Sequence, residues 1–404
     1  MVLIPNYGFY TIGVGIELII LAPLIFYMGK KVIKENKTGG WTPYLLGVVI
    51  IFFGAKLISE GILIHLKTVS YISMGTESAY VDALKYALTH GTFPYPIGCF
   101  VLYFTSFIFI FFGLYYIKEK YFSKQYDTNE KIEEKKNIRV HFLDLEISRK
   151  LFHICIIAVL IGYLMLGELI GMGVYNSTVS LYSNLPPGSF IPYDQIDFQD
   201  LLDNQYFGFI LNRWLVVFIS IVIGLVLILS EFLRFFNYRY YPIKTISSIY
   251  REKEKNAMGP HIYLVMGMGV AALLFTPPIA MSAIAISGLA DAVATIIGVT
   301  MGKKKVHKGS SKTWAGCIGG FVSAILFSMF SYFILMNKYN DLGLLNTYYP
   351  GVKPFSIPQG IIVSIAGALV FFLIDYSSPP IYFSDNLLNP ILCGLTMQII
   401  CYII

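Results

Sequence analysis

The chain has 404 residues, of which 56% are hydrophobic and only 13% are charged, and its mean hydropathy is +0.66. These values lie well outside the range of soluble domains, so they exclude a water-soluble enzyme and predict an all-α integral membrane protein that crosses the bilayer several times. The net charge of +6 is concentrated in particular loops, and nucleic acid is not expected as a partner.

Apolar stretches long enough to cross a membrane occur ten times along the chain. A helix needs about 20 apolar residues to do so. The predicted spans lie near residues 8–28, 43–65, 96–117, 151–173, 212–230, 260–276, 279–299, 313–336, 357–374 and 386–403. Lysines and arginines gather in the first, third, fifth and seventh connections, whereas residues 174–211 are acidic. Since cytoplasmic loops are enriched in Lys and Arg, these four connections are expected in the cytoplasm and both termini outside.

The first part of the chain predicts a separate membrane unit. Residues 1–117 contain three of the spans, and Lys56 and Glu60, four residues apart on one helix face, are expected to form a charge pair that lowers the cost of insertion. Residues 118–140 are strongly charged with both signs, which is typical of a cytoplasmic linker or a surface helix. This stretch is expected to divide the first three spans from the remaining seven.

The fourth span begins with E-I-S-R-K-L-F-H, in which four polar residues share one helix face at the cytoplasmic mouth. They are Glu146, Arg149, Lys150 and His153. Snorkelling towards the headgroups is a sufficient explanation for Arg149 and Lys150. It does not explain His153, whose position on the same stripe favours a surface that faces inward, towards a ligand.

The seventh span carries an aspartate inside an apolar helix. Thr276 and the two prolines after it allow only a tight turn, so the sixth and seventh spans are expected to form a helical hairpin that returns towards the cytoplasm. One face of the seventh span is made of small and polar residues: Gly288, Asp291, Thr295, Gly298 and Gly302. That face can admit a ligand. Burying Asp291 costs about 2.5 to 3.5 kcal/mol on insertion scales, which favours a functional role.

The loop after this span is basic and is followed by capping residues. Its lysines are Lys303, Lys304, Lys305, Lys308 and Lys312. Ser310, Ser311 and Thr313 are suited to cap a helix that begins near Trp314. Ammonium groups beside a helix N-terminus form a phosphate site. The alternative is that these lysines only fix the orientation of the protein in the membrane.

The last span is preceded by Ser384, Asp385 and Asn386, which capping alone would explain. Under the predicted topology this helix and three others begin at the cytoplasmic face, so four positive helix ends are able to face one polyanion. A nucleoside triphosphate with Mg²⁺ fits such a site, which is expected as a cleft open to the cytoplasm. Asp291 and Asp385 are suited to hold the cation, and Lys312, Arg149 and Lys150 to neutralise phosphate oxygens.

The stretch A-D-A-V-A-T-I-I-G-x-x-x-G-K, followed by K-x-x-x-K-T-W-A-G, resembles the signature of the family of dolichol kinases, phytol kinases and CTP-dependent diacylglycerol kinases. The R-K-x-x-H at residues 149–153 and the D-N-x-x-x-P at residues 385–390 are similar to further motifs of that family. The resemblance implies that residues 141–404 form a membrane kinase core. It leaves residues 1–117 unexplained.

The resemblance also implies an activity: the transfer of a phosphoryl group from CTP to the hydroxyl group of a membrane lipid alcohol. Asp291, His153 and Lys312 would be catalytic, with His153 or Asp291 as the candidate base. The family motifs imply nucleotide or phosphate binding by Arg149, Lys150, Arg251, Gly298, Gly302, Lys303, Thr313, Gly316 and Asn386.

Two other functions stay open at this point. A phosphatidate cytidylyltransferase would use the same nucleotide but release pyrophosphate in place of CDP. A transporter of an anionic solute would also fit ten spans and a buried Asp291, although no convincing internal repeat is visible and the polar motifs cluster at one face. The acceptor is open among polyprenol, a phytol-like alcohol and diacylglycerol, as are the oligomeric state and the membrane involved.

Overall fold

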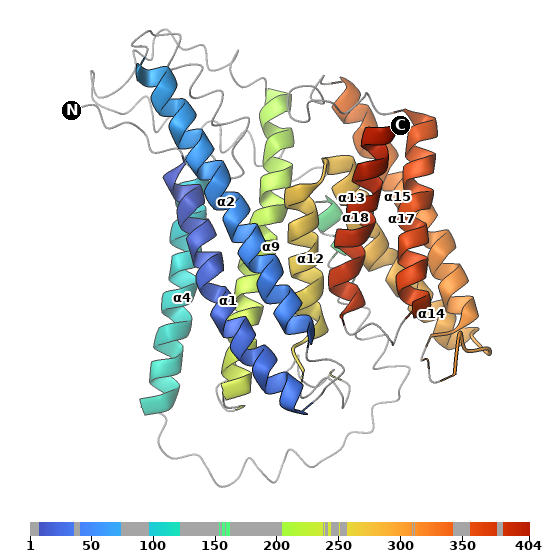
Figure 1. Ribbon diagram of the computed structural model, residues 1–404, viewed down its shortest axis with the longest axis horizontal. Helices are drawn as coiled ribbons and strands as arrows, with labels where there is room; N and C mark the ends of the chain where they lie inside the picture. The colour runs from blue at the N-terminus through green and yellow to red at the C-terminus, as the bar shows by residue number, and fades with distance from the viewer. Residues whose placement is uncertain are drawn as a thin grey trace.

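The computed structural model describes residues 8–35, 41–73, 97–121, 153, 156–157, 159–161, 204–236, 238, 241–243, 250, 257–308, 310, 312–341, 356–377 and 383–404. This part of the chain consists of helices and the turns that join them, and it contains no β-strand. The prediction of an all-α protein is therefore confirmed (Figure 1).

Eight helices in the described ranges are long and apolar enough to cross a membrane. Seven of them are α1 (Phe9–Glu35), α2 (Trp41–Ser73), α4 (Ile97–Tyr121), α9 (Asn204–Phe236), α15 (Trp314–Asp341), α17 (Ile357–Ser377) and α18 (Asp385–Ile403). The eighth runs from Pro277 to Thr300 and comprises α13 (Pro277–Ala285), a π-helical turn (Ile286–Ala290) and α14 (Asp291–Thr300).

The two other predicted spans have different outcomes. The span predicted at 260–276 forms α12 (Pro260–Leu274), an apolar helix of 15 residues, which is shorter than the rest. The span predicted at 151–173 lies mostly outside the described residues, and the positions of it that are described are helical. The predicted linker at 118–140 also lies outside them, apart from the end of α4.

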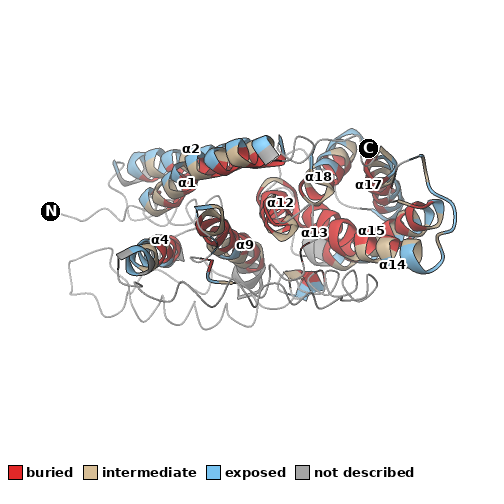
Figure 2. Cartoon of the chain, turned by 90° about the horizontal axis from the view of Figure 1, so that it is seen from below, coloured by how far each residue is buried: buried red, intermediate tan, exposed pale blue. Residues whose placement is uncertain are grey.

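The helices are arranged in two groups with α9 and α12 between them (Figures 1 and 2). α1, α2 and α4 lie on one side, and α13 to α18 lie on the other. α9 packs against α1 and α4, and on its other side against α12, which in turn packs against α18. The N-terminal helices therefore reach the rest of the molecule mainly through α9.

α1 and α2 form an antiparallel pair whose backbones touch. A Cβ atom placed on Gly15 would lie 2.6 Å from the carbonyl oxygen of Gly54, and one placed on Gly54 would lie equally close to the carbonyl oxygen of Gly15. The same relation holds seven residues away, between Gly8 and Gly61. Small residues at such positions let membrane helices approach closely, so this glycine seam excludes larger side chains.

Large apolar side chains cover the outer surface of the bundle. Phe107 on α4, Leu326 on α15 and Leu373 on α17 are each more than 60% exposed. Figure 2 shows this pattern, with buried positions towards the interior and exposed positions on the outer helix faces. An apolar surface of this extent is expected in contact with lipid.

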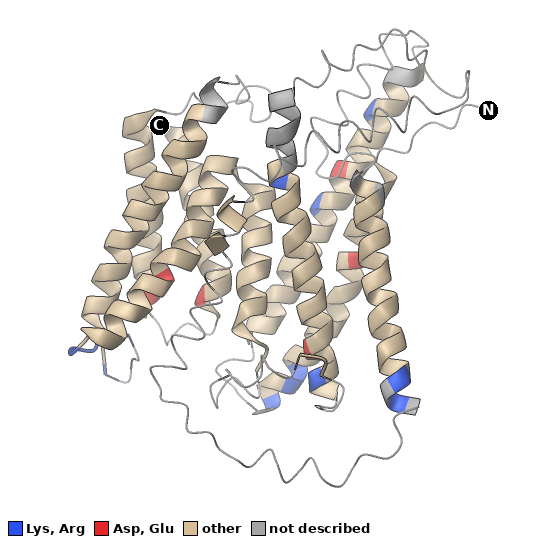
Figure 3. Ribbon diagram, turned by 180° about the vertical axis from the view of Figure 1, so that it is seen from behind, with Lys and Arg blue, Asp and Glu red and all other residues tan. Residues whose placement is uncertain are grey.

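Basic residues gather at one end of the bundle. α1, α4 and α9 end there in basic residues, and the loop between α14 and α15 carries three consecutive lysines, Lys303 to Lys305, at the same end (Figure 3). The helix ends that lead into all four connections predicted to be basic therefore lie at one end of the bundle. Which side of the membrane that end adjoins stays a prediction.

The predicted helical hairpin is present. α12 ends at Leu274, and α13 begins at Pro277 after a short turn. The first turn of α13 contains two prolines, which are tolerated there because the backbone N–H groups of a first turn have no partner within the helix. The backbone N–H and hydroxyl of Thr276 both donate to Gln398 Oε1 of α18, at 2.9 and 3.1 Å. The turn is thus tied to the last helix, and the hairpin returns the chain towards the basic end.

Candidate functional site

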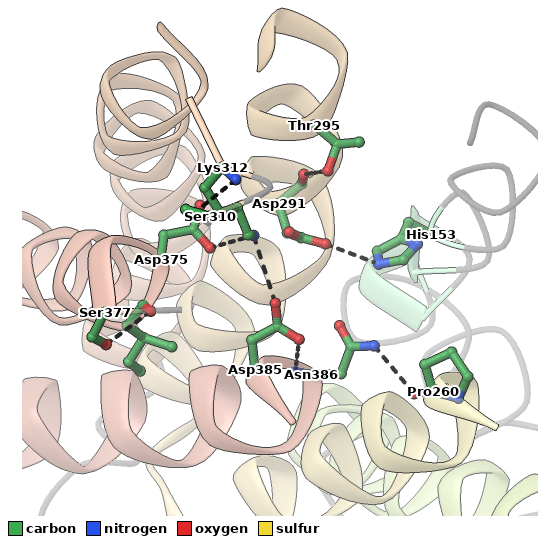
Figure 4. A network of polar contacts seen from close by, with 11 residues as sticks. His153, Pro260, Asp291, Thr295, Ser310, Lys312, Asp375, Ser377, Asp385 and Asn386 are labelled. Atoms are coloured by element: carbon green, nitrogen blue, oxygen red, sulfur yellow. Dashed lines mark hydrogen bonds and ion pairs between the residues drawn. The ribbon is translucent and has the colours of Figure 1, made fainter. Parts of the chain in front are cut away.

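Three buried or half-buried aspartates converge near the basic end of the bundle. Asp291 is the first residue of α14, Asp375 lies in the last turn of α17, and Asp385 is the first residue of α18. One carboxylate oxygen from each lies within 4.8 Å of those from the other two (Figure 4). Asp291 and Asp375 are 3% and 1% exposed, so most of this negative charge is removed from water.

Lys312 extends from the loop before α15 towards Asp375 and Asp385 (Figure 4). Its Nζ donates to Asp375 Oδ1 at 2.7 Å and lies 3.6 Å from Asp385 Oδ2. Burial lowers the pKa of the Lys312 ammonium, but the three carboxylates around it outweigh burial and raise that pKa above the ordinary lysine value. Lys312 is therefore a cation at neutral pH.

The loop holds the backbone of Lys312 in place on both sides. Lys305 and Thr313 form an antiparallel bridge, in which the Val306 N–H donates to the Lys312 carbonyl at 3.2 Å. The Lys312 N–H donates to Ser310 Oγ at 3.0 Å. The side chain of Lys312, rather than its backbone, is thus the part that is free to change position.

His153 lies next to Asp291, with Nε2 at 3.3 Å from Asp291 Oδ2. The histidine is 9% exposed, and neither ring nitrogen has a hydrogen-bond partner among the described residues. Ile156, one turn further along the same segment, packs against Gly288, where an added Cβ would lie 1.9 Å from the isoleucine. This contact brings His153 to the face of α14 that carries Asp291.

The cluster is suited to a divalent metal ion. Mg²⁺ prefers oxygen ligands, and three carboxylates facing one ammonium leave an excess of negative charge. Asp375 Oδ2 is buried and has no hydrogen-bond partner within the described ranges, which is a costly arrangement unless another group binds there. The residues present therefore fit the cation that the sequence predicted, with Asp375 as a third ligand.

Asp375 is a residue that the sequence reasoning missed. The predicted span at 357–374 ends one residue before it, and no role is predicted for Asp375. The signal was available: the aspartate follows the apolar run V-F-F-L-I, the same context that singled out Asp291. The predicted site members Asp291, His153, Lys312 and Asp385 are brought together as expected.

The predicted ligand-facing glycines lie instead in a helix–helix contact. A Cβ atom on Gly316 of α15 would lie 2.8 Å from the Ala294 carbonyl oxygen and 3.0 Å from Gly298 Cα of α14. One on Gly302 would lie 2.3 Å from Thr313 Oγ1. The expectation that this face admits a ligand is therefore wrong at these positions, because α15 occupies it.

Thr313 has a structural role in the described structure. Its Oγ1 accepts from the Gly316 N–H at 3.2 Å, which is an N-cap bond, and lies 3.4 Å from the Gly298 carbonyl oxygen, to which it donates. The predicted start of a helix at Trp314 is confirmed. Nucleotide binding by the Thr313 side chain would have to compete with these two bonds.

The remaining predicted site residues are distributed as follows. Lys303 is exposed in the loop that follows α14. Asn386 Nδ2 donates to the Pro260 carbonyl oxygen at 3.2 Å, which joins the start of α18 to the start of α12. Arg149, Lys150 and Arg251 lie outside the described residues.

A second buried polar group fixes the start of α12. Glu231 of α9 is fully buried and accepts from Arg234 at 2.7 Å, from the Tyr250 hydroxyl at 3.1 Å and from the Gly259 N–H at 3.2 Å. Arg234 also donates to the Ala257 carbonyl at 2.6 Å. Burial and the neighbouring Glu231 charge raise the pKa of the Tyr250 phenol, so that it remains a donor. This group is satisfied internally, as buried charges must be.

Fold and site together define an integral membrane protein that crosses the bilayer several times and carries a cluster of acidic residues near the basic end of its C-terminal helices. Comparison of the chain with family models, with curated proteins and with solved structures gives no match in any of the three.

Proposed function

We propose that this protein is a CTP-dependent lipid kinase, which transfers a phosphoryl group to the hydroxyl group of a membrane lipid alcohol. The observation that carries the proposal is the convergence of Asp291, Asp375, Asp385, Lys312 and His153 at the basic end of a membrane bundle. Intramembrane ionisable residues are expensive, and they mark functional sites by default. The motif resemblance supports the choice of CTP and of a lipid alcohol.

The three aspartates are proposed to hold Mg²⁺, which would neutralise charge on the nucleotide phosphates when bound. Lys312 contacts the phosphoryl group that is transferred. Catalysis of phosphoryl transfer rests mainly on positioning and on neutralising charge, and these residues supply both. The chain has no Walker P-loop, so the lysine that serves the phosphates has to come from elsewhere, and Lys312 fits that role.

His153 is proposed to accept the proton of the acceptor hydroxyl. The hydroxyl oxygen forms a bond to the γ-phosphorus, the bond from that phosphorus to the bridging oxygen of CDP breaks, and CDP leaves. Asp291, 3.3 Å from His153 Nε2, stabilises the imidazolium that results. The Nδ1 atom of His153 is buried and has no hydrogen-bond partner among the described residues, so it is suited to accept the proton without the loss of an existing bond to them.

The two substrates are proposed to arrive by different routes. The four predicted basic connections adjoin the end of the bundle near the site, and the positive-inside rule favours a cytoplasmic position for that end, where CTP is found (Figure 3). A lipid alcohol reaches the same depth from within the bilayer, since the outer faces of α15 and α17 are apolar.

The test is a reaction of the purified protein with γ-phosphate-labelled CTP or ATP and a panel of polyprenol, phytol and diacylglycerol. Label in one lipid product, with release of CDP, supports the proposal. Release of pyrophosphate would instead identify a cytidylyltransferase. Absence of lipid labelling with every acceptor, in protein shown to be folded by its thermal melting, would contradict the kinase assignment.

A further inference from the structure

The Lys312 ammonium contacts two of the three carboxylates that a metal ion in the cluster would need as ligands. It lies 2.7 Å from Asp375 Oδ1 and 3.6 Å from Asp385 Oδ2. The third, Asp291, faces the buried His153, whose ring nitrogens have no hydrogen-bond partner in the described part of the chain. The cluster thus already contains one cation and still has unsatisfied polar atoms at its border.

An ammonium group and a divalent ion compete for such oxygens. Both need the same lone pairs, and their like charges repel strongly at a distance of a few ångströms in a site shielded from water. Asp375 Oδ2 is the one buried carboxylate oxygen of the cluster that has no hydrogen-bond partner among the described residues. A metal ion that binds through all three aspartates must therefore displace the ammonium from at least one of them.

The Lys312 side chain is able to move away from the carboxylates. It is 23% exposed, and it consists of a flexible four-carbon stem on a backbone that the loop holds in place. Leaving the carboxylates without another partner is unfavourable for a buried cation. A phosphate group beside the metal ion would supply that partner.

We propose that Lys312 makes the cluster select a complex of a divalent cation with a polyphosphate over the free cation. The cation displaces the ammonium, and the phosphate accepts it, so each ligand favours binding of the other. This inference rests on the proposed function for the location of the site, and it does not depend on the identity of the lipid or the nucleotide base. In the empty site the Lys312 ammonium neutralises the carboxylates, and in the filled site it binds the phosphate.

The first experiment measures Mn²⁺ binding to the purified protein without nucleotide or lipid, from the electron paramagnetic resonance signal of free Mn²⁺. Lys312→Met is expected to bind Mn²⁺ at least about tenfold more tightly than the wild type, because a competing charge has been removed. Lys304→Met removes the same charge from an exposed position in the same loop and is the matched control. It is expected to match the wild type within about twofold. Unchanged or weaker Mn²⁺ binding by Lys312→Met would overturn the inference.

The second experiment tests the coupling to phosphate through thermal melting. Mn²⁺ and tripolyphosphate together are expected to stabilise the wild type by more than the sum of their separate effects, and Lys312→Met is expected to lose this excess. Lys312→Arg keeps a cation and should behave as the wild type in both experiments. If Lys312→Met is unstable without metal, Mn²⁺ in the purification buffers should restore it, and failure of that rescue would also count against the inference.

These outcomes are distinguishable from failure of the proposed function. A wild type that shows the coupling but phosphorylates no lipid would leave the inference intact and remove the kinase assignment. An active lipid kinase whose Lys312→Met variant does not gain Mn²⁺ affinity would support the kinase assignment and overturn the inference about Lys312.

Discussion

At Asp375, burial and charge act in opposite directions. The side chain is 1% exposed, which penalises its ionised form, and the Lys312 ammonium 2.7 Å away compensates for part of this cost. The other carboxylate oxygen remains without a partner within the described residues. Such a residue adds little to the stability of the fold, and its placement is better explained by a ligand that binds there.

We expect Asp375→Asn to reduce lipid phosphorylation by a factor of about 10² to 10³, in line with the loss of one preorganised electrostatic contact. The amide preserves the volume of the side chain but removes the charge that would hold Mg²⁺. The control is Glu17→Gln, which changes a carboxylate of α1 that accepts hydrogen bonds from Thr105 and Ser106 of α4. The measurement is the initial rate of lipid phosphorylation by each variant with the best lipid acceptor. Equal rates for the two variants would remove Asp375 from the site.

At the scale of single elements, α15 depends on one hydroxyl group at its start. Thr313 caps the helix through the Gly316 N–H and also bonds to α14 through the Gly298 carbonyl. Lys312 directly precedes Thr313. Thr313 therefore fixes both the start of α15 and the position from which the Lys312 side chain extends.

Thr313→Val should lower the stability of the protein by about 1 kcal/mol, the usual cost of losing an N-cap, whereas Thr313→Ser should retain the bond. The measurement is the melting temperature of both variants in the same detergent. A melting temperature for Thr313→Val equal to that of Thr313→Ser would show that the cap contributes nothing.

The glycine seam between α1 and α2 is a second feature whose packing a single added methyl group should disturb. Gly54→Ala places a methyl group 2.6 Å from a backbone oxygen, which cannot move without shifting α1. Gly113→Ala on α4 is the matched control, since nothing lies within 4 Å of that position, and alanine there should be neutral or stabilising by about 0.5 to 1 kcal/mol. Resistance to unfolding by denaturing detergent should fall for the first variant and not for the second. A Gly54→Ala protein as resistant as the wild type would mean that the helices are not in backbone contact.

The sequence was sufficient to predict the elements whose signals are local. Apolar length predicted the long helices, and a capping residue predicted where α15 begins. The packing of Gly298 against Gly316 was not predictable in this way, since a face of small residues serves a ligand or a neighbouring helix equally well. The partners of Lys312 depend on where α17 and α18 end relative to α14, which is a property of the tertiary structure.

At the scale of the whole molecule, charge asymmetry and the candidate site lie at the same end. The lysines there are more numerous than the three aspartates need as counter-ions, which is the pattern expected of residues that orient a protein in the membrane. At the other end of the bundle, Arg213 donates to the Ala272 and Leu273 carbonyls at the end of α12. The two ends of the protein therefore have different electrostatic character.

Single cysteines introduced into a variant without the five native cysteines should report this orientation. Cysteines at Lys118 and Lys305 are expected to react with a membrane-impermeant thiol reagent only from the cytoplasmic side, and one at Ser73, at the other end of α2, only from outside. Labelling is measured on intact cells and on inverted vesicles. Reaction of the cysteine at position 305 from outside would place the aspartates away from cytoplasmic CTP and contradict the proposed route.

The contact between α1 and α2 also bears on how the protein is made. The two helices are close in the chain, and their mutual surface is complete without any later residue, because glycine carbonyls of one helix meet glycines of the other. Such a pair is able to assemble as soon as its second helix has been synthesised, before the aspartates of α14, α17 and α18 leave the ribosome. The charged groups of the site would then enter the bilayer beside helices that are already folded, which lowers the time that they spend exposed to lipid.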